Sequence, residues 1–128
     1  MSPRAAIGLA LDVVLVLVFA AIGRASHDEG NAVVGVLATA APFVAGTAVG
    51  WIVVSRPGRR SPLDLGPGIP VWLCTVAVGM VLRRVVGDGT ALSFVIVATL
   101  VLGAFLLGWR AAYARWRGSR QRQKVRAS

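Results

Sequence analysis

Asp12 is the first candidate for a functional residue, because it is the one ionisable side chain well inside a long apolar stretch. A carboxylate in such a stretch is costly in a membrane and is kept where it binds a proton, an ion or a partner. Thr47 and Thr75 lie at a similar depth in two other apolar stretches. We predict an intramembrane polar site at Asp12, Thr47 and Thr75; alternatively, Asp12 is structural and bonds these threonines or Arg110.

A second group of polar residues surrounds two short connections between apolar stretches. It contains Arg24 and His27 in the first connection and Arg83 and Arg84 at the second. Arginines beside a histidine could bind a phosphate or an anionic headgroup. Alternatively, they form a solvated rim of ion pairs with the carboxylates of the same connections. Because neighbouring helical residues point about 100° apart, we expect one arginine of the pair at the interface and the other turned toward the protein.

No other pattern in the sequence indicates reactive chemistry. One cysteine and one histidine cannot form an intrachain disulfide or a Cys/His metal site. Zinc-protease, phosphate-loop, dinucleotide and nucleophile–base motifs are missing from the sequence. We therefore expect no catalytic residue, no metal and no cofactor, and we do not expect an enzyme.

The composition is that of a membrane protein. Hydrophobic residues make up 56% of the 128 residues and charged ones only 15%, against about a quarter in soluble domains. Apolar blocks at 5–23, 32–54, 69–86 and 91–113 each approach the roughly 20 residues that cross a bilayer as a helix. The fold class predicted is an all-α, four-helix transmembrane bundle over residues 1–113.

The distribution of positive charge predicts the orientation. With both termini in the cytoplasm, 11 of the 14 basic residues lie inside, as the positive-inside rule requires. This topology places the protein in the cell membrane. Residues 114–128 form a basic tail that we expect to be disordered and to bind anionic lipid headgroups, and nucleic acid is not an expected partner.

Small and aromatic residues suggest how the helices pack. Gly46 and Gly50 form a surface that lets helix backbones approach closely, within the bundle or against a second copy. Trp51, Trp72 and Trp109 fall at the cytoplasmic ends of three spans, where tryptophan anchors a helix at the interface.

Two of the spans share an ending. Gly46-xxx-Gly50-Trp51 corresponds to Ala104-xxx-Gly108-Trp109. Two tandem helical hairpins would produce this match, and so would two helices that independently need a small face and an anchor.

Five short motifs occur in order between residues 24 and 94: Arg24-xx-His27-xx-Gly30, Pro42-Phe43-xx-Gly46-xxx-Gly50-Trp51, Gly68-xxx-Trp72, Gly79-Met80-xx-Arg83 and Gly87-x-Gly89-Thr90-Ala91-xx-Phe94. Together they resemble domain of unknown function 3054, a family of small prokaryotic membrane proteins. The resemblance spans residues 8–112 and implies a compact four-helix membrane protein. It implies no activity, substrate or catalytic residue.

The sequence supports two functional hypotheses. The first is a structural or accessory membrane subunit or a lipid-interacting protein, with a membrane protein or a second copy as partner. The second is a small oligomeric transporter or channel that uses Asp12 as a proton or cation site.

Overall fold

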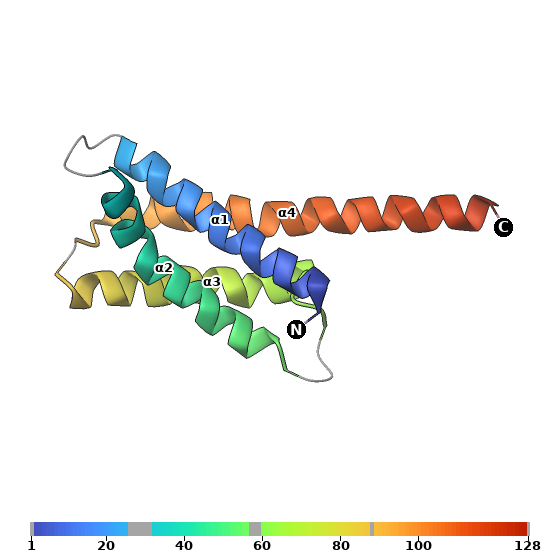
Figure 1. The fold of residues 1–128 in the computed structure, drawn as a ribbon, viewed down its shortest axis with the longest axis horizontal. Coiled ribbons are helices and arrows are strands. Elements are labelled where there is room, and N and C mark those ends of the chain that lie inside the picture. Colours follow the sequence, from blue (N-terminus) through green and yellow to red (C-terminus); the bar gives the residue numbers. More distant parts are fainter. Residues whose placement is uncertain (1, 26–31, 57–59, 88, 128) are drawn as a thin grey trace.

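The computed structural model of the protein describes residues 2–25, 32–56, 60–87 and 89–127. These residues form four α-helices and no strand (Figure 1). All four helices are long and apolar enough to cross a membrane. The prediction of an all-α bundle with four candidate spans is confirmed. The helices are α1 (Pro3–Ala25), α2 (Ala32–Val54), α3 (Leu65–Val85) and α4 (Leu92–Ala127).

The helices form a ring in which each contacts its neighbours in the chain and α1 also contacts α4. The closest pair is α2 and α3. A Cβ atom on Gly46 would lie 2.6 Å from the carbonyl oxygen of Cys74, and one on Gly50 would lie 2.8 Å from the Cα of Val71. The backbones therefore touch. In this structure α3 of the same chain therefore covers the face of Gly46 and Gly50 for which a contact with a second copy was one prediction.

Three phenylalanines form the core at the end of the bundle nearest the α3–α4 turn. The rings of Phe19 and Phe43 meet edge to face with centroids 5.5 Å apart, and Phe94 lies 6.3 and 6.2 Å from them. A side chain on Gly79 would collide with the ring of Phe43. These rings come from α1, α2 and α4, so aromatic packing joins three helices there.

α4 differs from the prediction at its C-terminal end. The expected disordered tail is instead helical to Ala127, which makes α4 36 residues long, and α4 runs straight past the bundle in Figure 1. The span supplies the costly helix nucleus, and the arginines, glutamines and lysine that follow are good helix formers. Tyr113 and Trp116 stack at 6.0 Å, with Arg117 and Arg120 over their rings. Local contacts therefore support the extension.

α3 also begins before its predicted first residue, 69. Its first helical residue is Leu65, preceded by Asp64. Pro67 lies in the first turn, where backbone N–H groups have no partner within the helix, so the missing N–H of proline costs little.

Candidate functional site

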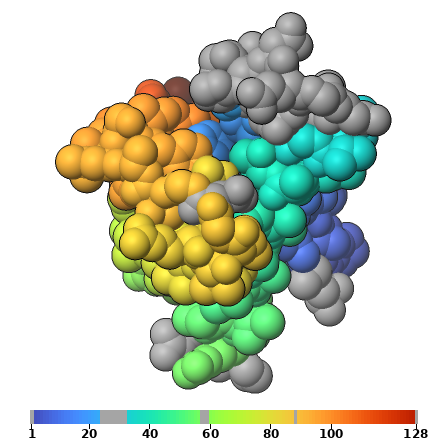
Figure 2. Space-filling view, turned by 90° about the vertical axis from the view of Figure 1, so that its left-hand side faces the viewer, coloured from blue at the N-terminus to red at the C-terminus, as the bar shows by residue number. Residues whose placement is uncertain are grey.

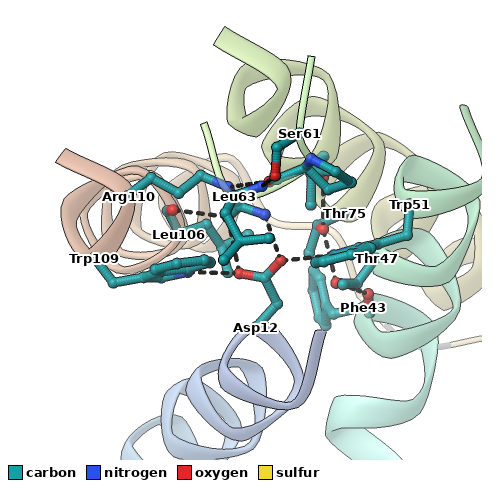
Figure 3. Close-up of polar contacts among 12 residues, drawn as sticks. Asp12, Phe43, Thr47, Trp51, Ser61, Leu63, Thr75, Leu106, Trp109 and Arg110 are labelled. Atoms are coloured by element: carbon teal, nitrogen blue, oxygen red, sulfur yellow. Dashed lines mark hydrogen bonds and ion pairs between the residues drawn. The ribbon is translucent and has the colours of Figure 1, made fainter. Parts of the chain in front are cut away.

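Asp12 of α1 is fully buried and accepts four hydrogen bonds (Figure 3). Its Oδ1 accepts from Nε1 of Trp109 at 2.8 Å and from Nη1 of Arg110 at 2.9 Å. Its Oδ2 accepts from Nε1 of Trp51 at 2.7 Å and from Nη2 of Arg110 at 2.8 Å. The carboxylate thus forms a bidentate ion pair with Arg110 of α4. It also accepts one indole hydrogen bond from α2 and one from α4.

Arg110 is as buried as the carboxylate it binds. Its Nε donates to the carbonyl oxygen of Pro62 at 3.0 Å, and its Nη1 also donates to that of Leu106 at 2.9 Å. The side chain crosses α3 where a Cβ on Gly68 would collide with its Cδ. The guanidinium therefore joins α1, α4 and the loop between α2 and α3, and glycine leaves the space it needs.

The two indoles that bind Asp12 pack over a glycine of α1. Gly8 lies one turn before Asp12 on the same face. A Cβ there would lie 3.3 Å from the Cη2 of Trp51 and 3.4 Å from that of Trp109. Leu63, 8% exposed, also contacts this position. Rings and leucine together exclude solvent from the ion pair.

Thr47 and Thr75 form a separate network between α2 and α3. Their hydroxyl oxygens are 2.8 Å apart, and each hydroxyl also lies within bonding distance of a carbonyl one turn earlier, Phe43 or Val71. Each hydroxyl has a single hydrogen, so one donates to the other and the second donates to its own helix. No hydrogen bond joins this pair to Asp12 among the described residues, although both groups lie in one region of the bundle (Figure 3).

The geometry determines what the site can do chemically. A bidentate arginine–carboxylate pair is the strongest form of charge-assisted hydrogen bond. Two further donors complete the shell of Asp12, and no buried side-chain nitrogen or oxygen of the described residues lacks a partner. A proton or cation could reach Asp12 only after Arg110 or an indole has moved away. In the described conformation the site joins helices.

The indole bonds give a measurable contribution to stability. We expect Trp51→Phe to lower the free energy of unfolding more than Trp72→Phe does. Both changes remove a similar ring area, but Trp51 donates to a buried charge, whereas Trp72 donates to the carbonyl of Thr99 at 3.0 Å. Bonds to charged groups contribute about 1.5–3 kcal/mol and neutral ones about 0.5–1.5 kcal/mol. Denaturation in detergent measures both losses; equal losses would contradict a special role for the bond to Asp12.

Arg83 is half-buried against the ring of Phe94 and Arg84 is exposed, which is the division between protein and surface predicted from their helical spacing. Nε of Arg83 donates to the carbonyl oxygen of Gly89 at 3.1 Å, and Nη1 of Arg84 donates to Oγ1 of Thr90 at 3.4 Å. Two long side chains that start about 100° apart can still converge on adjacent residues of the turn that follows. The side chain of Arg24 and the whole of His27 lie outside the described residues.

Sequence reasoning identified Asp12 and named Arg110 as one alternative partner, but it assigned Trp51 and Trp109 only to the membrane interface. That anchoring role stays a prediction. The indole N–H groups of both residues point inward to Asp12. The shared ending of the two spans was a signal for this, because equivalent tryptophans on two helices can reach one acceptor between them.

Comparison with known proteins identifies a family. A family model described as "Protein of unknown function (DUF3054)" matches residues 9–113. No curated protein and no solved structure matches the chain. The matched region contains the complete Asp12–Arg110 site and ends where the basic extension of α4 begins.

Proposed function

The chain belongs to the family described as "Protein of unknown function (DUF3054)", and from this premise we propose that it is a structural or accessory protein of the cell membrane. The described helices are compatible with a multi-pass membrane protein. Catalysis is not part of the proposal, because the sequence contains no recognised nucleophile, base or cofactor motif.

One observation carries this proposal, namely the closed shell of Asp12. A transport or catalytic site needs a polar group with a free position for its substrate. Asp12 instead uses both oxygens on three fixed partners from α2 and α4. Buried polar networks of this kind specify how helices associate, and this supports a role in assembly.

The outward face of α1 supports the same role. Ile7, Leu11, Val14, Val18 and Ile22 recur at intervals of three and four residues and are each at least 40% exposed. Such a stripe is suited to lipid chains or to an apolar helix of another membrane protein. Native mass spectrometry of the gently solubilised chain tests the proposal. A bound partner or a defined oligomer is expected, and a uniform monomer without a partner would contradict an accessory role.

We also propose that both termini lie in the cytoplasm, which the excess of basic residues at that end supports. The test uses cysteine labelling in intact cells. In a Cys74→Ser background, Ser119→Cys should react only after the membrane is permeabilised, whereas Thr90→Cys should react from outside. The reverse labelling pattern would contradict this orientation.

A second candidate is a transporter or channel, favoured by one feature: an ionisable pair is buried in segments that can span the membrane. It requires Arg110 to release Asp12 during each cycle. We expect vesicles containing the protein to take up protons and monovalent cations no faster than empty vesicles. Uptake that exceeds this control and is lost in a folded Asp12→Asn variant would establish transport and overturn the structural proposal.

A further inference from the structure

Arg83 and Arg84 use little of their hydrogen-bonding capacity on the described residues. Among the described residues, each makes a single hydrogen bond, which goes to the turn between α3 and α4 at Gly89 or at Thr90. The ion pairs among the described residues involve Arg110 and Arg117, so neither of these two arginines has a described carboxylate partner. A guanidinium carries five N–H donors. Two guanidinium groups, each with N–H donors that have no described partner, therefore lie against one short segment.

Aromatic stacking fixes the position of one of them. The Cζ of Arg83 lies 4.4 Å from the ring centroid of Phe94, and Phe94 packs against Phe19 and Phe43 in the core. This contact holds the guanidinium over the ring, and Nη1 and Nη2 of Arg83 have no hydrogen-bond partner among the described residues. Arg83 is half-buried and Arg84 is exposed, so a ligand from outside can reach both.

The turn also lies at the right level for a lipid headgroup. It is at the end of the bundle opposite the chain termini (Figure 1), and Figure 2 looks onto that end. Arg110 follows Leu92 by 18 residues of α4, which is about 27 Å of helix. Since the hydrocarbon core is about 30 Å thick, a bundle with the Arg110 end near one interface has this turn near the other. Lipid phosphates lie at that level.

We propose that Arg83 and Arg84, with the hydroxyl of Thr90, bind the phosphate group of an anionic lipid. Arginine is the side chain whose fork of donors matches phosphate, and two forks on one segment can surround its oxygens. This site deepens the proposed membrane function by assigning a ligand class to the bundle. It also explains why two arginines lie at this end of the protein. By the positive-inside rule, the end on the outer side of the membrane should carry few basic residues.

A purely structural role for the pair makes a different prediction. Both arginines lie in the last turn of α3, where positive charge interacts favourably with the helix dipole. That interaction does not depend on lipid and does not use the Nη1 and Nη2 donors of Arg83. Removing the charges would then change stability without changing the lipids bound.

The test is native mass spectrometry of the full chain in mild detergent, titrated with phosphatidylglycerol, phosphatidylcholine or inorganic phosphate. We expect binding of phosphatidylglycerol to exceed that of phosphatidylcholine, and the double variant Arg83→Gln/Arg84→Gln to lose about tenfold in affinity for it, equivalent to about 1.4 kcal/mol. Arg84→Lys keeps the charge but loses the fork, and should show a smaller loss. The matched control is Arg56→Gln/Arg60→Gln, which removes the same charge from exposed positions of the loop between α2 and α3 and should bind as the unmodified protein does.

Three outcomes would overturn the proposal. They are an unchanged affinity in the first double variant, an equal loss in the control pair, and displacement of the lipid by millimolar inorganic phosphate, which would assign the site to the free ion. A melting curve of the double variant checks that it folds; if it does not, the Arg84→Lys comparison decides. The uptake assay with Asp12→Asn uses different residues, so failure of the lipid site and failure of the structural proposal are distinguishable.

Discussion

Arg110→Leu should lower the free energy of unfolding by about 3–5 kcal/mol, the largest effect of any single substitution we expect in this protein. The change leaves the carboxylate of Asp12 buried without its ionic partner, and an uncompensated buried charge carries a cost of this size. It also removes the donors to the carbonyls of Pro62 and Leu106. Denaturation in detergent, followed by the fluorescence of the tryptophans beside the site, measures the loss.

Two comparisons make this result specific. Arg117→Leu also removes an arginine of α4 from an ion pair, but that pair with Asp64 is exposed and spans 3.8 Å, so its loss should cost at most about 1 kcal/mol. The exchanged pair Asp12→Arg/Arg110→Asp conserves charge yet should not recover stability. The indole N–H groups of Trp51 and Trp109 can only donate, and they would then face another donor. Full recovery in the exchanged protein would contradict the geometry described for the site.

Gly50→Ala should cost about 1–3 kcal/mol, whereas Gly108→Ala should be neutral or stabilise the protein. The two glycines occupy equivalent places before Trp51 and Trp109 in the shared ending. A Cβ on Gly50 would lie 2.8 Å from the Cα of Val71, but one on Gly108 meets nothing within 4 Å. Overpacking of a tight contact carries the stated cost, and alanine in an open helical position gains about 0.8–1.0 kcal/mol over glycine.

The same denaturation assay measures both variants. Equal effects at the two glycines would mean that the contact between α2 and α3 is looser than described. Destabilisation by Gly108→Ala alone would indicate that another molecule covers α4 at this position in the membrane.

The four helices were predictable because each is an apolar block of spanning length between polar connections, which is a local property of the sequence. Their ends were less so. The tail after Tyr113 is charged enough to suggest disorder, yet its helix grows from one already formed, and its arginines stack on Tyr113 and Trp116. That stacking depends on helical geometry, so composition alone does not reveal it.

The polar site was predictable in its central residue but not in its full set of partners. Asp12 is conspicuous as an ionisable side chain within an apolar block. Trp51 and Trp109 equally fit an interface, and only the ring order of the helices brings their indole nitrogens to one carboxylate. The contribution of Pro62 is a backbone carbonyl, which no side-chain pattern can reveal.

The sequence separation within the ion pair has a consequence for biosynthesis. Asp12 and Arg110 are 98 residues apart, so the ribosome makes the aspartate long before the arginine. Until α4 is in place, α1 holds a carboxylate without its cation, which is costly for an aspartate within a membrane span. A chain that stops before α4 therefore keeps an unpaired charge that the complete protein lacks. The unpaired carboxylate of Asp12 thus distinguishes a chain that still lacks α4 from one that contains it.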